Sequence, residues 1–379
     1  MDRYVKLGTL ITPAKTVRCG NGKYPTLSMT MHSGLVFQDE KFKKIIASQD
    51  TSDYKVVYRN QLVISFPIDE GVLAAQRITD AGIVSPAYGI WDIDQSQVLP
   101  EFLEYALRCN RAIQYYKAKL RGSTARRRSL PTPTLLEYSV PLPDIERQST
   151  IIDTLHRVET IIEKRRVQIQ KLDDLVKSRF VEMFDAGSPS KWKMHIHDYA
   201  DVISGFAFSS EGFCENEVPI IRISNINNGK ISPDSSICFP RDFWESNERY
   251  RVLNGDVLMA MSGATTGKAG INTYSGPLLL NQRVASIRAK QMVSTSEFLF
   301  AATQLPWMYD LIQEASAGCA QPNISGKQIE NMPIPAADYE KQKEFSVFAN
   351  QIENLKLTVQ PGLDKLELLK QSLMQKYFG

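Results

Sequence analysis

Residues 171–184, KLDDLVKSRFVEMF, have a counterpart near the end of the 379-residue chain in residues 365–378, KLELLKQSLMQKYF. The two stretches share an initial Lys-Leu pair, a serine and a final phenylalanine at matching positions. Nearly the same displacement aligns four earlier pairs in unbroken order: YPTLSMT (24–30) with VPIIRIS (218–224), NQLVIS (60–65) with NGDVLMA (254–260), EFLEYALRCNRAIQYYK (101–117) with EFLFAATQLPWMYDLIQ (297–313), and VPLPDIERQ (140–148) with MPIPAADYEKQ (332–342). A repeat of this length predicts two copies of one structural unit.

Each copy ends in a predicted long helix, at residues 146–185 and 339–379. A seven-residue apolar repeat of this kind is typical of a coiled-coil seam, although Pro361-Gly362 is expected to kink or interrupt the second helix. If both halves share one geometry, the helices run antiparallel and pack along their seams. The seam residues are Leu155, Ile162, Ile169, Val176 and Met183, with Val158, Arg165, Leu172 and Arg179 between them, and in the second copy Ile352, Val359, Leu366 and Leu373.

The predicted fold class is therefore α+β. Two pseudo-repeat globular α/β domains, residues 1–145 and 186–338, are joined and separated by the antiparallel helix pair, with approximate internal two-fold symmetry. Tyr377 and Phe378 are expected to cap the junction between a globular domain and the helices.

The composition is that of an ordinary globular protein, with 43% hydrophobic and 23% charged residues. The five cysteines include no CxxC pair, which favours reduced thiols in a cytoplasmic protein over a zinc site. His195 and His197 are too isolated to predict a metal site, and no cofactor is expected. No apolar run approaches the length of a membrane span.

Positive charge is unevenly distributed. The net charge is only +3, but residues 100–130 contain eight basic residues against two acidic ones. Such a stripe predicts a docking surface for a polyanion, with a solvated helix face as the alternative.

The glycine-bearing stretch 262–268, SGATTGK, is no phosphate-binding P-loop. Gly263 and Gly267 enclose three residues where the P-loop requires four, and Ala269 stands where it requires a hydroxyl. Because strand-like sequence flanks the stretch on both sides, it predicts the tip of a β-hairpin.

The segments 254–271, 280–288 and 332–342, with 83–91 and 141–148 in the first half, resemble the specificity subunit of type I restriction-modification systems. The resemblance covers essentially the whole chain. It implies a non-catalytic subunit whose two globular domains recognise a bipartite, asymmetric site in double-stranded DNA. It also implies partners: two DNA adenine methyltransferase subunits and restriction subunits with endonuclease and translocase activity. The sequence agrees in lacking an Asn/Asp-Pro-Pro-Tyr/Phe methyltransferase motif.

Candidate DNA contacts are polar and basic residues in predicted loops, because such side chains pair with base edges and phosphates. In the second half they are Asn225, Asn227, Lys230, Thr265, Thr266, Lys268, Asn281, Gln282, Arg283, Gln321 and Asn323. In the first half they are Tyr88, Lys117, Lys119, Arg121, Arg126, Arg127 and Arg128.

Two other classes of function stay open. A coiled-coil protein-interaction scaffold with peptide-binding globular domains would bind no duplex DNA, whereas phosphate contacts give an affinity that falls with salt. A stand-alone methyltransferase or nuclease with decayed motifs is the third possibility.

Overall fold

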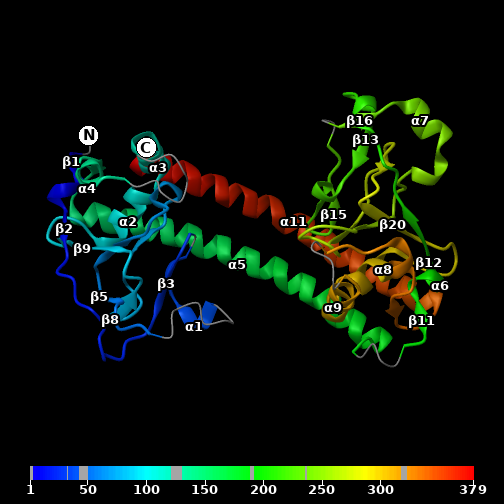
Figure 1. Cartoon of the computed structure of the whole chain (residues 1–379), viewed down its shortest axis with the longest axis horizontal. Coiled ribbons are helices and arrows are strands. Elements are labelled where there is room, and N and C mark those ends of the chain that lie inside the picture. Colours follow the sequence, from blue (N-terminus) through cyan, green and yellow to red (C-terminus); the bar gives the residue numbers. More distant parts are fainter. Residues whose placement is uncertain are drawn as a thin grey trace. The chain divides into compact units, whose positions relative to one another are not determined.

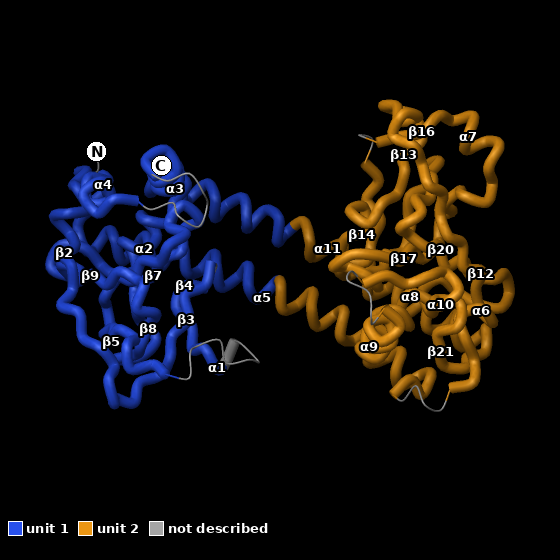
Figure 2. The backbone as a smooth tube through the Cα atoms, viewed as in Figure 1, with its two compact units in different colours: residues 1–165, 362–379 blue, residues 166–361 orange. Residues whose placement is uncertain are grey.

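The computed structural model describes residues 3–31, 33–41, 50–120, 130–187, 192–234, 237–316 and 322–379. The chain divides into two compact units (Figure 2). Unit 1 comprises residues 1–165 and 362–379, and unit 2 comprises residues 166–361. The two long helices labelled in Figure 1 are α5 (Ile145–Phe184) and α11 (Tyr339–Phe378). Each of them contributes residues to both units, as the colours of Figure 2 show.

Unit 1 combines short strands with the short helix α1 and with three helices, α2, α3 and α4, that have counterparts in unit 2. Its strands are β1 (Tyr4–Lys6), β2 (Ile11–Pro13), β3 (Leu27–Thr30), β4 (Gly34–Phe37), β5 (Lys55–Tyr58), β6 (Leu62–Ile64), β7 (Leu73–Ala75), β8 (Ala81–Val84), β9 (Gly89–Ile93) and β10 (Ser139–Pro141). Its helices besides α5 and α11 are α1 (Gln38–Lys41), α2 (Pro100–Arg108), α3 (Asn110–Lys119) and α4 (Thr132–Leu136).

The main sheet of unit 2 has six strands, compared with four in unit 1. Its strands are β11 (Met194–His195), β12 (Ala200–Ser204), β13 (Val218–Ile221), β14 (Ile226–Asn227), β15 (Lys230–Ile231), β16 (Cys238–Phe239), β17 (Val257–Ala260), β18 (Ala269–Ile271), β19 (Leu279–Leu280), β20 (Val284–Ala289) and β21 (Pro333–Ile334). Its shorter helices are α6 (Ile196–Tyr199), α7 (Arg241–Ser246), α8 (Ser296–Thr303), α9 (Pro306–Ala315) and α10 (Gly326–Glu330).

The predicted duplication is visible in the strand order. The main sheet of unit 1 has the order β2-β9-β6-β7, and the sheet of unit 2 begins with the corresponding order β12-β20-β17-β18. In unit 1, helices α2, α3 and the short α4 follow β9 along the chain. In unit 2, helices α8, α9 and the short α10 follow β20 in the same way. The other strands are arranged differently. Unit 2 extends its main sheet with β15 and β14 and has the separate sheet β16-β13-β19, whereas unit 1 has the two-stranded sheets β3-β4 and β5-β8.

The helices that follow each sheet bury one apolar face. In α2, Phe102, Leu103, Ala106 and Leu107 are all fully buried, at the spacing that places them on one side of a helix. The corresponding helix α8 begins at Ser296. The hydroxyl of the preceding residue, Thr295, caps it by accepting a hydrogen bond from the amide of Phe298 in the first turn. These faces build the main core of each unit.

The α5–α11 pairing in unit 1 runs antiparallel. Phe378, at the end of α11, is fully buried in the same core as Leu155 near the start of α5. Farther along α5, the carboxylate of Glu159 pairs with Lys370, which lies earlier on α11 (Nζ to Oε1, 2.8 Å). The expectation that Phe378 caps the junction of helix and globular domain is confirmed.

Helices α5 and α11 also run antiparallel within unit 2. Lys356 of α11 pairs with Asp173 of α5 (2.7 Å), while Phe345, earlier on α11, packs against Phe180, later on α5 (centroids 5.3 Å apart). The predicted apolar seam residues of both helices are buried or half-buried, whereas Arg165 and Arg179 are exposed.

Of the two outcomes expected at Pro361-Gly362, a kink or an interruption, the interruption does not occur. Helix α11 continues through both residues. Pro361 is exposed, and a side chain at Gly362 would meet no atom within 4 Å, so nothing packs against the position where proline removes a helix hydrogen bond.

Candidate nucleic-acid interface

The stretch 262–268 forms the tip of the predicted hairpin. Strands β17 and β18 pair antiparallel on either side of it. Gly263 and Gly267 take positive φ angles of 87° and 89°, which glycine adopts without strain. A Cβ on Gly267 would also lie 2.9 Å from Ile312 of α9, so this glycine is required for the tip to pack on that helix.

Backbone hydrogen bonds bring two further loops to this tip. The amide of Met261 donates to the carbonyl of Arg283 (2.9 Å), and the carbonyl of Met261 accepts from Ile324 (2.8 Å). The turn 281–283 and the segment 322–324 therefore both contact Met261, the residue that follows β17. Three segments that are far apart in sequence thus meet at one end of the sheet.

A fourth segment is joined through side chains. Strands β14 and β15 form a hairpin whose turn residues, Asn228 and Gly229, have φ angles of 49° and 75°. Positive φ at both positions is the signature of a type I′ turn, which the Asn-Gly pair favours. Lys268 Nζ donates to Asn227 Oδ1 (3.1 Å) and connects this hairpin to the tip.

We call this surface of unit 2 the polar edge. Its residues are exposed or half-exposed and carry amide, hydroxyl or basic groups. Asn228 was not predicted as a contact, although the Asn-Gly pair was visible in the sequence as a turn signal. The polar edge comprises Asn227, Asn228, Lys230, Thr265, Lys268, Asn281, Gln282, Arg283 and Asn323.

Two predicted contacts do not belong to this surface. Asn225 is 4% exposed and bonds the backbone of Arg222 and Ser232 with its side-chain amide. Thr266, also 4% exposed, donates its hydroxyl to the carbonyls of Gly263 and Pro322. Their polar atoms are used to shape the loops, which corrects both predictions. Gln321 lies outside the described residues.

One basic residue of the polar edge is already paired. Lys230 Nζ lies 2.5 Å from Glu353 Oε1 on α11, and Glu353 also meets Lys356 (3.1 Å). Burial alone raises the pKa of Glu353, but the contacts with Lys230 and Lys356 outweigh it and hold this pKa below its usual value.

The corresponding loop of unit 1 differs in chemistry. Residues 65–72 join β6 to β7, as the tip joins β17 to β18, and Gly71 again has a positive φ of 73° beside an isoleucine of α3. This loop contains Asp69, Glu70 and a Phe66 that is 62% exposed, where unit 2 has hydroxyls and a lysine. The two units share a backbone plan but present different groups.

The predicted contacts of unit 1 are partly accounted for. Tyr88 is half-buried in the turn between β8 and β9, and its carbonyl accepts from Lys55 Nζ (2.7 Å). Lys117 and Lys119 are exposed near the end of α3. The remaining predicted residues, Arg121, Arg126, Arg127 and Arg128, lie outside the described residues.

Two arginines of the basic stripe have structural partners. Arg108 binds Glu104 (2.9 Å) and the carbonyl of Met31 (2.6 Å). Arg111 donates to the carbonyl of Phe378 (2.9 Å) and lies over the ring of Tyr138. Arg108 and Arg111 therefore bind groups within unit 1, whereas Lys117 and Lys119 of the same stripe are exposed.

Comparison with known proteins identifies the family. Residues 189–363 match the model of the type I restriction modification DNA specificity domain. The chain is 25% identical over 254 residues to the type I restriction enzyme MjaVIII specificity subunit of Methanocaldococcus jannaschii, a match that covers 62% of this chain and 60% of that protein. Residues 189–363 thus belong to the type I DNA specificity family.

A second relative is the type I restriction enzyme EcoBI specificity subunit of Escherichia coli, 25% identical over 183 residues. That match covers 48% of this chain and 35% of the relative. The matches thus span less than two thirds of the length of either curated relative.

Solved structures support the fold. The S subunit of a type I restriction-modification system from M. genitalium aligns over 100% of this chain and 96% of its own, with 13% identity and a TM-score of 0.57. A chain from a study of complex assembly and conformational transition in the type I system aligns over 99% and 97%, with 18% identity and a TM-score of 0.53. Within the described residues, no helix is long and apolar enough to cross a membrane.

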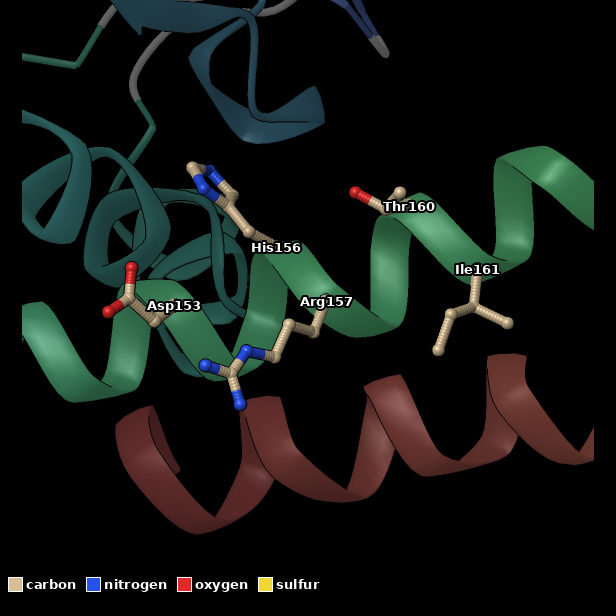
Figure 3. A pocket seen from close by; sticks show the side chains of 5 residues that line it. All are labelled: Asp153, His156, Arg157, Thr160 and Ile161. Atoms are coloured by element: carbon tan, nitrogen blue, oxygen red, sulfur yellow. The ribbon is translucent and has the colours of Figure 1, made fainter.

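The long helices also present surface to solvent. In unit 1 a shallow pocket of about 490 Å³ is lined by five residues of α5. Figure 3 shows Arg157 and Ile161 on the side of α5 that faces α11, and His156 on the other side. Apolar side chains on both helices are exposed: Ile161, Val167, Leu175, Val347, Leu355, Leu357, Leu368 and Leu369.

Proposed function

We propose that the whole chain is a type I specificity subunit, which reads a bipartite, asymmetric sequence in double-stranded DNA with one half-site for each unit. The observation that carries the proposal is the duplicated sheet with unlike loops. The strand orders β2-β9-β6-β7 and β12-β20-β17-β18 place equivalent loops at equivalent positions, and those loops differ in side chains. Two copies of one reader with different reading groups would select two different half-sites.

The polar edge of unit 2 has the chemistry of a base reader. Gln282 and Asn323 are exposed amides, which can bond adenine through N6 and N7, and Arg283 is an exposed guanidinium, which can bond guanine through O6 and N7. Lys268 supplies a cation for phosphate and is already oriented by Asn227. In unit 1, Lys117 and Lys119 are the described cations for the same role.

We further propose that the helices recruit the partner subunits: two DNA adenine methyltransferase subunits and, through them, the restriction subunits. Leu368 in unit 1 is 66% exposed, and Val347 in unit 2 is 60% exposed. Exposed apolar residues repeated along a helix are typical of protein docking surfaces. The adenine chemistry and its cofactor would belong to the partners.

The proposal is tested by expressing the chain with its methyltransferase subunits in a host that lacks adenine methylation, followed by methylation-sensitive sequencing of the genome. We expect methylated adenine within one split motif whose two halves differ. Methylation that needs no copy of this chain, or a single continuous motif, would contradict the proposal.

A binding experiment separates DNA reading from the peptide-scaffold alternative. The purified complex is titrated with duplexes that carry the split motif, at several salt concentrations. The logarithm of the affinity should fall linearly with the logarithm of the salt concentration, because phosphate contacts release counterions. A peptide scaffold would bind neither the motif nor a scrambled duplex.

A further inference from the structure

Two imidazoles and a carboxylate lie close together in unit 2 directly before β12, away from the polar edge. His195 ends β11, and His197 and Asp198 belong to α6. One ligand atom from each residue lies within 4.8 Å of the other two. The sequence showed the two histidines, but the third group joins them because the chain turns into a short helix directly after β11.

The tautomer of His197 is set by a backbone contact. Its Nδ1 lies 3.0 Å from the carbonyl oxygen of Glu330 in α10. A carbonyl can only accept, so Nδ1 carries the proton and Nε2 keeps a free lone pair. Metal-binding histidines are held in this way, with the second ring nitrogen donating to a carbonyl or carboxylate.

The carboxylate is oriented as well. Asp198 Oδ2 accepts from the backbone amide of His195 (2.8 Å), which turns Oδ1 toward His197 Nε2 at 3.5 Å. The ring of His195 lies parallel to that of His197, with centroids 5.3 Å apart, and its Nδ1 is 4.0 Å from Asp198 Oδ2. Small side-chain rotations would bring the three ligand atoms around one ion.

We propose that His195, His197 and Asp198 bind one divalent transition-metal ion of the Zn²⁺ class. Two imidazole nitrogens and one carboxylate oxygen suit zinc or nickel, whereas magnesium and calcium prefer oxygen ligands alone. The side chains of His195, His197 and Asp198 are 40%, 47% and 32% exposed, so water completes the coordination.

The bound ion has a structural role in this arrangement. It fixes α6, and His197 in turn bonds α10 through the carbonyl of Glu330. Strand β12, the edge strand of the main sheet, begins directly after α6. Because the ion binds only the folded state, it stabilises unit 2 by mass action.

The test is isothermal titration of the full chain with ZnCl₂ and NiCl₂, in a chelator-free buffer with a non-coordinating phosphine reductant. The expected result is one saturable event with one ion per chain. His197→Gln, which can still donate to Glu330, should weaken it at least tenfold, and Asp198→Asn should also weaken it. His195→Gln is a second variant at the site.

The controls remove candidate ligands elsewhere. His156→Gln and Cys214→Ser should leave the affinity and stoichiometry unchanged, and circular dichroism checks that each variant is folded. The proposal is overturned if the wild-type chain shows no saturable event. It is also overturned if the event persists unchanged in the double variant His195→Gln/His197→Gln, or disappears in Cys214→Ser.

Discussion

Gln148 and Gln342 occupy equivalent places in the two units and make the same three hydrogen bonds. Both side chains are fully buried near the start of a long helix. The Oε1 of Gln148 accepts from the amide of Leu99 (2.8 Å), and its Nε2 donates to the carbonyls of Gln97 and Pro143 (both 2.9 Å).

The second glutamine repeats this pattern. Gln342 accepts from the amide of Thr295 (3.0 Å) and donates to the carbonyls of Val293 (3.1 Å) and Ala337 (2.9 Å). Each glutamine thus satisfies three backbone groups that surround the helix start. The duplication is therefore preserved in individual hydrogen bonds as well as in strand order.

Replacing either glutamine by leucine should destabilise the unit to which it belongs. Three buried backbone groups lose their partner, and the cost should be about 2–4 kcal/mol of unfolding free energy. Urea unfolding followed by circular dichroism measures it. Gln114→Leu, on the exposed face of α3, is the matched control and should change stability by less than about 0.5 kcal/mol. Equal effects of Gln148→Leu and Gln114→Leu would contradict this prediction.

Arg283→Ala should weaken binding to duplex DNA and relax the choice of base in one half-site only. Loss of a bidentate base contact costs about 1–3 kcal/mol of discrimination. Competition binding with duplexes mutated one base pair at a time measures the effect. Lys193→Ala removes an exposed cation outside the polar edge and should leave the base preference intact. A uniform loss across all sequences would instead make Arg283 a phosphate contact.

Glu353→Gln should make unit 2 less sensitive to acid. The pKa of Glu353 is held below its usual value in the folded chain, so its ion pairs stabilise the fold above the unfolded pKa. This contribution is lost as the pH falls through the folded pKa. Urea unfolding of the wild-type chain at pH 7 and pH 3 should therefore show a larger drop in stability than the same comparison for Glu353→Gln. Identical drops would show that the ion pairs do not contribute.

Leu368→Glu should reduce the affinity for the methyltransferase subunits and leave DNA binding by the isolated chain unchanged. A charge placed within an apolar docking surface should cost on the order of 1–2 kcal/mol, which is roughly five- to thirtyfold in affinity. Analytical ultracentrifugation with the purified partner measures it. Leu253→Glu introduces the same charge at an exposed leucine outside the long helices and should have no effect. An unaffected complex would place the partner elsewhere.

Much of the fold could be predicted because the chain repeats itself. The Lys-Leu pairs at 171 and 365 align the copies, and the heptad residues mark the two long helices, observed at Ile145–Phe184 and Tyr339–Phe378. The hairpin around 262–268 followed from its glycines and flanking strands. These signals are local periodicities and turn residues, which depend little on the rest of the fold.

The polar side chains were harder to assign. Asn225 and Asn227 look alike in sequence, but Asn225 turns inward to bond Ser232, whereas Asn227 stays exposed and bonds Lys268. Which of two asparagines faces solvent depends on how the backbone turns between them. Glu353 could not be predicted as the partner of Lys230, because the ion pair joins a hairpin to a helix far along the chain.

The burial of Phe378 affects how the protein is made. Its ring packs against Phe102, with centroids 5.1 Å apart, so the core of unit 1 includes a residue translated after all of unit 2. On the ribosome, the core of unit 1 therefore stays incomplete, and the apolar side chains around the Phe378 site stay uncovered, until the end of α11 has been translated and has left the exit tunnel. During that interval the nascent chain is exposed to aggregation and to chaperones, and a message truncated before α11 would yield an incomplete unit 1.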